Sequence, residues 1–256
     1  MIRHFSSWEK WWNSEIPSSC SQSLLTSGQR IILQEGLDDM RDQYEKQLNT
    51  LNQYMTEMGR GIIEAINEAI RALMNQDAES ARKNIGHDRE VDHLEREIEN
   101  LCLKLLLSQQ PVATDLRMVS AALKMVTDME RIGDHAADIS EITILLTEAG
   151  YPSDLSMVKE MADEAVFMVK ESIEAYVERD AQRAADVIRH DDVVDQYFID
   201  IKKKIIRAIN ENIQNGEQAA DVLMIVKYLE RIGDHATNLA EWILFYITGE
   251  HPEVTV

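Results

Sequence analysis

Residues 129–136 read Met-Glu-Arg-Ile-Gly-Asp-His-Ala, and residues 229–236 read Leu-Glu-Arg-Ile-Gly-Asp-His-Ala. The two stretches differ only at their first position and begin 100 residues apart. Their surroundings match as well, so the sequence predicts two copies of one structural unit. The further matching pairs are Leu123 and Leu223, Val126 and Val226, Glu141 and Glu241, Asp88 and Asp191, and Asp92 and Asp195.

Helical periodicity runs outward from both copies and is interrupted at few places. The chain has only 10 glycines and 4 prolines in 256 residues, which favours long helices. Asp77 and Asp180 are predicted to cap helices, and Pro111, the 150–152 stretch and Asn215-Gly216 to end them. The fold class expected is all-α, two tandem three-helix bundles related by internal duplication, over residues 40–150 and 151–248. The helices expected are about 40–75, 77–107, 111–148, 153–179, 180–215 and a last one ending near 248, followed by a tail, 249–256.

Residues 1–39 differ from the rest of the chain. Serines, Pro17 and Gly28 break the periodicity there, so this segment is predicted to be poorly ordered. Met40 opens the first strong helical pattern, and Gln34-Glu35-Gly36 could be encoded by a purine-rich ribosome-binding sequence. We therefore hypothesise that translation starts at Met40. The alternative is a genuine short extension whose tryptophans bind something.

The formal net charge of −20 limits the classes of partner. An acidic surface repels nucleic acid and anionic lipid, and it suits cations or the basic faces of proteins. Two distant cysteines, Cys20 and Cys102, indicate a reducing compartment. No run of about 20 apolar residues and no secretory signal is present, so a cytoplasmic location without membrane insertion is expected.

Carboxylates lie on helix stripes that are otherwise apolar. Leu123, Val126 and Glu130 share one face, and Asp92 and Glu130 each lie 19 residues from Pro111. In a hairpin these two carboxylates reach the same height on neighbouring helices. Crowded carboxylates need neutralisation, and oxygen-only ligands suit hard metals, with Zn²⁺ also possible. The predicted ligands of a multinuclear metal site are Asp88, Asp92, Glu130, Asp134 and Asp138 in one half, and Asp191, Asp195, Glu230 and Asp234 in the other.

Other roles are open for these motifs. The carboxylates could form a salt-bridge network with Arg131, Arg231 and Arg117, or lie on a groove rather than in the core. His135 and His235 point away from their neighbouring aspartates, so packing is the more expected role. Gly133 and Gly233 indicate a close approach of another backbone or a ligand.

The motifs together resemble the PhoU family. They are Asp88-x-x-x-Asp92, the run Gln109-Gln110-Pro111-Val112-Ala113-x-Asp115-Leu116-Arg117, and Glu130-Arg131-Ile132-Gly133-Asp134, and the resemblance covers about residues 40–248. It implies a pair of three-helix bundles whose acidic motifs, Asp88, Asp92, Glu130 and Asp134 with Asp191, Asp195, Glu230 and Asp234, bind clusters of metal such as Fe, Zn, Mn or Mg. Asn238 stands where the first half has Asp138, so the two sites are expected to differ in affinity.

The resemblance also implies a function. Family members hold phosphate-starvation genes off when phosphate is plentiful. They link a phosphate ABC transporter ATPase to a sensor histidine kinase at the inner membrane face, and many are homodimers. They are not known primarily as enzymes. The alternative from another class is a metal-dependent enzyme acting on phosphate compounds, against which stands the lack of a nucleophile or base motif.

Overall fold

The computed structural model describes residues 27–86, 88–108, 113–149 and 154–250, with side chains given except at residues 27–40, 88, 108, 149 and 215. The chain divides into two units, Met1–Lys46 and Gln47–Val256. Within the first unit the described residues are the beginning of a helix. The packing and the sites below belong to the second unit.

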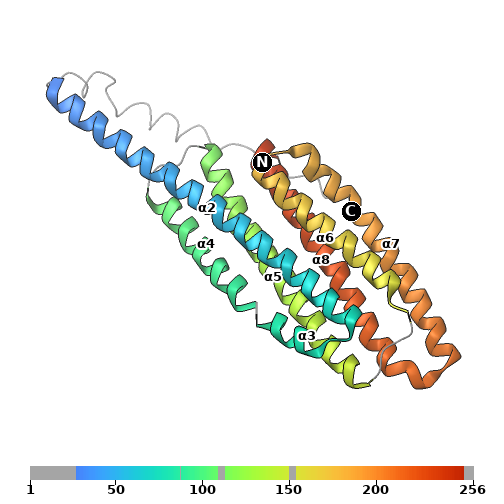
Figure 1. Cartoon of the computed structure of the whole chain (residues 1–256). Coiled ribbons are helices and arrows are strands. Elements are labelled where there is room, and N and C mark those ends of the chain that lie inside the picture. Colours follow the sequence, from blue (N-terminus) through green and yellow to red (C-terminus); the bar gives the residue numbers. More distant parts are fainter. Residues whose placement is uncertain (1–26, 87, 109–112, 150–153, 251–256) are drawn as a thin grey trace, which may run out of the picture. The chain divides into compact units, whose positions relative to one another are not determined.

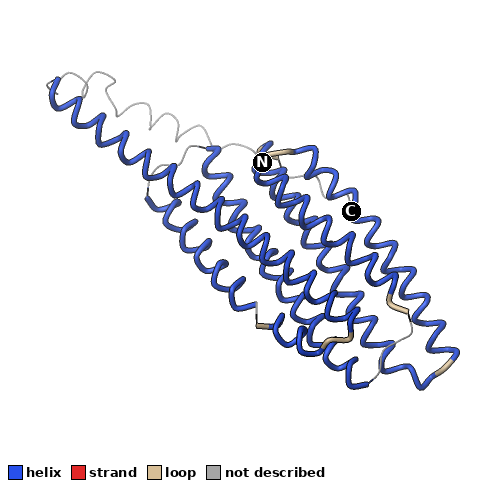
Figure 2. Tube along the Cα trace, in the orientation of Figure 1, coloured by secondary structure: helices blue, strands red, loops and turns tan. Residues whose placement is uncertain are grey.

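The described residues are helical, with short turns between the helices and no strand among them (Figures 1 and 2). The all-α class is therefore confirmed. The elements in chain order are α2 (Ser27–Asn75), α3 (Ala78–Ile85), α4 (Asp88–Ser108), α5 (Ala113–Ala149), α6 (Ser156–Glu178), α7 (Ala181–Glu211), the 3₁₀ turn η1 (Ile213–Asn215) and α8 (Gly216–Thr248).

The packing follows the internal duplication. In the first repeat α3 and α4 pack on α5, and in the second repeat α6 and α7 pack on α8 and on each other. Helices α5 and α8, which carry the two matching stretches, pack together and join the repeats. Helix α2 contacts both repeats: Asn84 of α3 donates to the Ala65 carbonyl at 2.9 Å, and Ile173 of α6 lies against Gly59.

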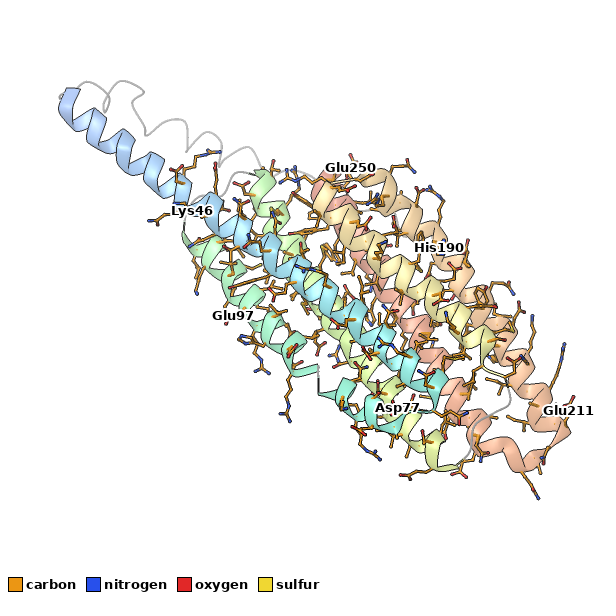
Figure 3. The ribbon with its side chains drawn as sticks, viewed as in Figure 1. Lys46, Asp77, Glu97, His190, Glu211 and Glu250 are labelled. Atoms are coloured by element: carbon orange, nitrogen blue, oxygen red, sulfur yellow. The ribbon has the colours of Figure 1, made fainter. Side chains whose placement is uncertain are left out.

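Both predicted aspartate caps are present. Asp77 Oδ1 accepts hydrogen bonds from the backbone N–H groups of Glu79 and Ser80 at 3.0 and 3.1 Å. Asp180 Oδ1 accepts from the N–H of Gln182 at 2.9 Å in the same way. Figure 3 shows Asp77 at the turn between α2 and α3. These bonds satisfy donors at the helix start that have no partner within the helix.

Two predicted helix boundaries are wrong. The helix expected over 77–107 is interrupted after Ile85, where the N–H of Gly86 bonds back to the Lys83 carbonyl at 3.0 Å. Glycine is the weakest helix former after proline, and the interruption lies at Gly86. Helix α2 begins at Ser27 rather than near residue 40, because residues 29–39 contain no proline and several good helix formers.

The connection from α7 to α8 also differs from the prediction. Helix α7 ends at Glu211, before the expected Asn215-Gly216 stop. Asn212 adopts an extended backbone, and its side chain accepts from the N–H of Gln214 at 3.1 Å, which starts η1. Gly216 then opens α8 instead of ending α7. The expected turns at Pro111 and 150–152, residues 1–26 and the tail from 251 lie outside the described residues.

Gly133 and Gly233 mark close helix contacts, as the repeat predicts. A Cβ on Gly133 would lie 3.2 Å from Val91 of α4, and one on Gly233 would lie 3.3 Å from Val194 of α7. Larger side chains at these positions would push the helices of each hairpin apart. None of the helices in the described ranges carries an apolar stretch long enough to cross a lipid bilayer.

Candidate functional site

The acidic residues of the second repeat come together between α7 and α8. Burial, together with repulsion from Asp195 and Asp234, raises the pKa of Asp191 to about 6. A Cβ on Gly233 would lie 3.3 Å from Asp191 Oδ1, so the glycine makes room for this carboxylate. The four-residue spacing on each helix therefore aligns carboxylates across the hairpin, as the sequence predicts.

The remaining groups of this set are also crowded. The pKa of Asp195 is raised by burial and by the charge of Glu230, and the pKa of Asp234 is raised by burial and again by Glu230. One cation compensates, because Lys227 makes an ion pair with Glu230. The site holds more carboxylates than cations, which leaves an excess of negative charge in a half-buried place.

The first repeat has a similar set between α4 and α5. The pKa of Glu130 is raised by burial, and the charges of Asp134, Glu95 and Asp92 add to the effect. The matched heights expected for Asp92 and Glu130 are thus supported. Glu95, one turn beyond Asp92, belongs to the same set, and its own pKa is raised by burial and by nearby carboxylates. Glu95 is not among the predicted ligands, although its i+3 spacing from Asp92 is a signal for a shared helix face.

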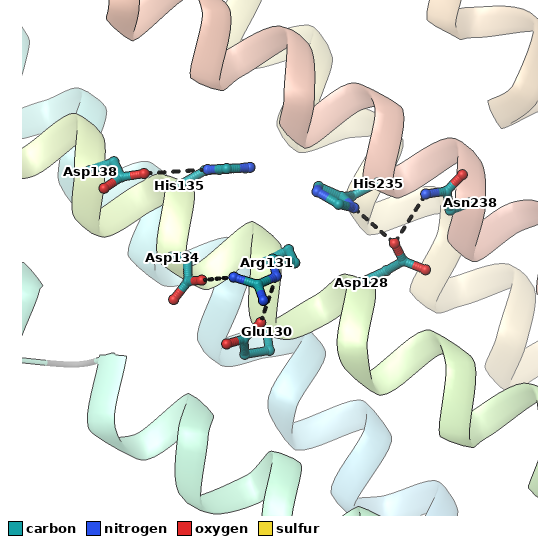
Figure 4. A network of polar contacts seen from close by, with 8 residues as sticks. All are labelled: Asp128, Glu130, Arg131, Asp134, His135, Asp138, His235 and Asn238. Carbon is teal, nitrogen blue, oxygen red and sulfur yellow. Dashed lines mark hydrogen bonds and ion pairs between the residues drawn. The ribbon is translucent and has the colours of Figure 1, made fainter.

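Two arginines partly neutralise the first set: Arg96 Nη2 lies 3.8 Å from Asp92 Oδ2, and Arg131 pairs with two other carboxylates. Arg131 Nη1 lies 2.9 Å from Asp134 Oδ2, and its Nε lies 3.4 Å from Glu130 Oε2 (Figure 4). The salt-bridge alternative thus holds for Arg131. Arg117 lies elsewhere, beside Gly249. Glu130 keeps 18% of its side-chain exposure and Asp134 keeps 32%, so both carboxylates are partly exposed rather than part of the core.

Asp88 and Asp138 are the other two predicted ligands of the first repeat. Asp88 opens α4, but its side chain lies outside the described ones. Asp138 faces another neighbour, because its Oδ2 lies 3.5 Å from His135 Nδ1, and burial together with the Asp138 charge raises the pKa of Tyr228 on α8. Asp138 therefore lies toward the contact between α5 and α8, which we call the seam.

The seam contains a polar network that crosses between the repeats. His235 Nδ1 of α8 lies 2.8 Å from Asp128 Oδ1 of α5, and Asn238 donates to the same oxygen at 3.1 Å (Figure 4). Asp128 keeps only 16% of its side-chain exposure. Since a buried carboxylate without partners is costly, these two donors stabilise it and tie α8 to α5.

The other half of the seam is aromatic. The His135 ring stacks on Tyr228 with centroids 5.3 Å apart, and it lies 5.6 Å from the His235 ring. Burial lowers the pKa of His135, so the uncharged ring is favoured. The histidines are therefore packing and hydrogen-bonding residues, as expected. Asp128 and Tyr228 are not among the predicted site residues, because no pattern within one repeat brings them together.

The carboxylate sets suit a metal ion in their chemistry. Each offers several oxygen donors crowded enough to raise pKa values, and Mg²⁺, Mn²⁺ and iron prefer such ligands. Among the described side chains, however, no three His, Cys, Asp or Glu groups already form an arrangement that could hold a metal ion. The donors fit in type, and binding would require side chains to turn and the Arg131 and Lys227 ion pairs to open.

Comparison with known proteins identifies one matching family. A family model described as the PhoU domain matches the chain twice, at residues 55–143 and 158–243. These two ranges lie inside the two predicted repeats. The matched ranges contain all nine predicted ligands and both ends of the seam network.

Relatives and solved structures agree with this match. The chain is 34% identical over 212 residues to a phosphate-specific transport system accessory protein PhoU homolog of Clostridium acetobutylicum, covering 82% of this chain and 97% of the relative. A Borreliella burgdorferi protein with the same description is 30% identical, at 84% and 100% coverage. The crystal structure of PhoU from Pseudomonas aeruginosa superposes with a TM-score of 0.79 at 29% identity, covering 81% of this chain and 100% of that one.

Proposed function

Because this chain belongs to the PhoU domain family, we propose that it regulates phosphate uptake and holds the phosphate-starvation response off when phosphate is plentiful. The observation that supports the proposal most is the double PhoU domain match, one for each repeat. Relatives covering more than four fifths of the chain are described as accessory proteins of the phosphate-specific transport system. A regulator of this kind acts by binding other proteins and needs no catalytic site.

We propose that its partners are the ATPase of a phosphate ABC transporter and a sensor histidine kinase. An acidic chain of net charge −20 suits basic faces on such proteins better than it suits nucleic acid. The protein would then act at the inner face of the membrane through these partners, without a spanning helix of its own. A homodimer is part of the same proposal.

We further propose that the carboxylate sets bind metal ions. Asp191, Asp195, Glu230 and Asp234 would hold the ion of the second repeat, and Asp92, Glu130 and Asp134, with Asp88, that of the first. A bound cation would supply the positive charge that the raised pKa of Asp191 indicates is lacking. These side chains come from both helices of each hairpin, so their ligation would fix the angle between α4 and α5, and between α7 and α8.

The regulatory role is tested in the native organism with a phosphate-starvation reporter grown in ample phosphate. Deletion of the gene should switch the reporter on, and restoration should silence it. A silent reporter and normal phosphate uptake after deletion would contradict the role. Turnover of a phosphate ester by the pure protein, lost in Glu130→Ala, would instead support the enzyme alternative.

Metal binding is tested separately by elemental analysis of protein purified without chelator. The expected result is bound metal that is reduced in Glu130→Ala and in Glu230→Ala, and abolished in the double variant. Glu250→Ala, which removes an exposed acid at the end of the described chain, is the matched control. Metal-free parent protein whose helical content is unaffected by chelator would contradict this part of the proposal.

A further inference from the structure

A cleft of about 510 Å³ lies away from the carboxylate sets, between α2 of the first repeat and α6 and α8 of the second. Its size is within the range of small-molecule sites, which often form between domains. We call it the inter-repeat cleft. The lining residues used below are Asn52, Glu57 and Arg60 of α2, Tyr176 of α6, Arg179 just after α6, and Tyr246 of α8.

The two arginines of the cleft differ from a neighbouring arginine in their ion pairing. Arg183, at the start of α7, is neutralised by ion pairs with Glu171, Glu174 and Glu178. For Arg60 and Arg179, by contrast, no carboxylate of the described residues lies within ion-pair distance. In a protein with 46 acidic and 26 basic residues, two such guanidinium groups lining one cleft point to an anionic ligand.

The first repeat shows which residue occupies the position equivalent to Arg179 outside the cleft. The capping residues Asp77 and Asp180 occupy the same place in the two repeats, after α2 and α6. The residues before them, Gln76 and Arg179, both have a left-handed backbone, with φ of 57° and 56°. The repeat therefore fixes the backbone at this position but does not require an arginine, since glutamine serves in the first half.

The two tyrosines of the cleft also differ from the corresponding residues of the first repeat. With the helices aligned by their caps and their identical stretches, Leu73 corresponds to Tyr176, and Leu146 corresponds to Tyr246. All four side chains are buried, so leucine is sufficient for packing at both places. Arg179, Tyr176 and Tyr246 thus all differ from their counterparts in the first repeat. Arg179 can bind a polar ligand, and the two tyrosines can orient Arg179.

These residues hold Arg179 in place. The Arg179 guanidinium carbon lies over the Tyr246 ring, 5.5 Å from its centroid, which is a cation–π contact. Tyr246 lies beside Tyr176, with ring centroids 6.1 Å apart, and the Tyr176 hydroxyl donates to Asn52 Oδ1 at 2.8 Å. A guanidinium oriented before binding loses less entropy when it meets its ligand.

We propose that the inter-repeat cleft binds a phosphorylated organic molecule of about nucleotide size, with Arg60 and Arg179 on its phosphoryl oxygens. Two guanidinium groups match a phosphoryl group, which has several oxygens and more than one negative charge. Glu57 also lines the cleft and accepts hydrogen bonds, so it selects for a hydroxyl or amine on the same molecule and against the bare ion. This inference is independent of the proposed regulatory function.

The test is isothermal titration of the full chain after treatment with chelator, which removes metal-dependent phosphate binding. The probes are ADP, ribose 5-phosphate and inorganic phosphate. At least one organic phosphate should bind with a Kd below about 1 mM, and Arg60→Gln and Arg179→Gln should each weaken it by about tenfold or more. Tyr246→Leu, which installs the residue of the first repeat, should weaken binding less.

Arg207→Gln is the matched control, because it removes the same charge from an exposed position on α7 outside the cleft. Its affinity should equal that of the parent. Both cleft arginines are exposed, so their variants should fold, as circular dichroism would verify. Binding of no probe, equal binding by the parent and both arginine variants, or binding of inorganic phosphate alone would overturn the proposal.

Discussion

The rings of His135 and His235 lie 5.6 Å apart, and the two residues occupy the same position in the two repeats. Their neighbours differ, because His235 bonds to Asp128 whereas His135 stacks on Tyr228, which corresponds to Asp128 in the other repeat. The seam between α5 and α8 is therefore an asymmetric contact built from duplicated positions. Because the contacts on the two sides differ, they favour one alignment of α5 against α8.

The first prediction concerns the seam. Asp128→Ala removes the acceptor of His235 and Asn238 and should lower the free energy of unfolding by about 1–3 kcal/mol, since half-buried donors lose their partner. Asp163→Ala, which removes an exposed ion pair with Lys159, should change it by less than about 0.5 kcal/mol. Urea unfolding followed by circular dichroism measures both. Equal losses in the two variants would show that the network contributes nothing specific.

The second prediction concerns pH. Asp191 has a pKa of about 6 in the folded chain against 3.8 ordinarily, so between these values the folded state holds a proton that the unfolded state has lost. This group therefore makes the protein less stable as pH rises from about 4 to 6, with the full loss present above that window.

The matching experiment compares metal-free parent protein with Asp191→Asn. The variant should be the more stable of the two at pH 7, and the difference should shrink toward pH 4. Urea unfolding at four pH values between 4 and 7 measures it. A variant that is less stable than the parent at pH 7 would contradict the destabilising effect of the ionised Asp191.

The third prediction uses two glycines of α2 that lie two residues apart. A Cβ on Gly59 would lie 2.8 Å from Cγ1 of Ile173, whereas a Cβ on Gly61 would meet nothing within 4 Å. Gly59→Ala should lower the free energy of unfolding by about 1–3 kcal/mol through overpacking. Gly61→Ala should raise it by about 0.5–1 kcal/mol through helix propensity.

A double variant tests the contact between residue 59 and Ile173 directly. Gly59→Ala combined with Ile173→Ala should lose less stability than the sum of the two single changes, because alanine lacks the three Ile173 atoms nearest the new methyl group. Thermal unfolding of the four proteins measures the comparison. A stabilising Gly59→Ala would mean that α2 and α6 are not in the close contact described.

The fourth prediction concerns Arg131 as a competitor for metal. Its guanidinium is paired with Glu130 and Asp134, so a cation must displace it. Arg131→Gln should tighten Mn²⁺ binding by about fivefold, since removing one nearby positive charge is worth about 1 kcal/mol. Arg231→Gln, at the same position of the second repeat, is the control. Calorimetric titration that shows unchanged or weaker binding in Arg131→Gln would contradict competition.

Much of the fold was predictable because its signals are local or repeated. The 3.6-residue periodicity, the caps Asp77 and Asp180 and the repeated stretch led to the helices and the duplication. The break at Gly86 was missed because one glycine is tolerated in many helices, and only its surroundings decide whether the helix stops there.

The candidate sites were predictable where residues of one hairpin face each other. Asp92 and Glu130 could be matched in height from the turn between them. The seam could not be predicted this way, because Asp128 meets His235 only when the two repeats pack, and no pattern within one repeat contains that information. The side chain of Asp138 turns toward the seam for the same reason.

The most direct test of the central claim, a regulator that works through its two carboxylate sets, is a starvation reporter in a deletion strain complemented with Glu130→Gln/Glu230→Gln. Arg207→Gln serves as the control, and protein levels are matched by immunoblot. In ample phosphate the double variant should leave the reporter on, whereas the parent and the control should silence it. Full silencing by the double variant would contradict the claim.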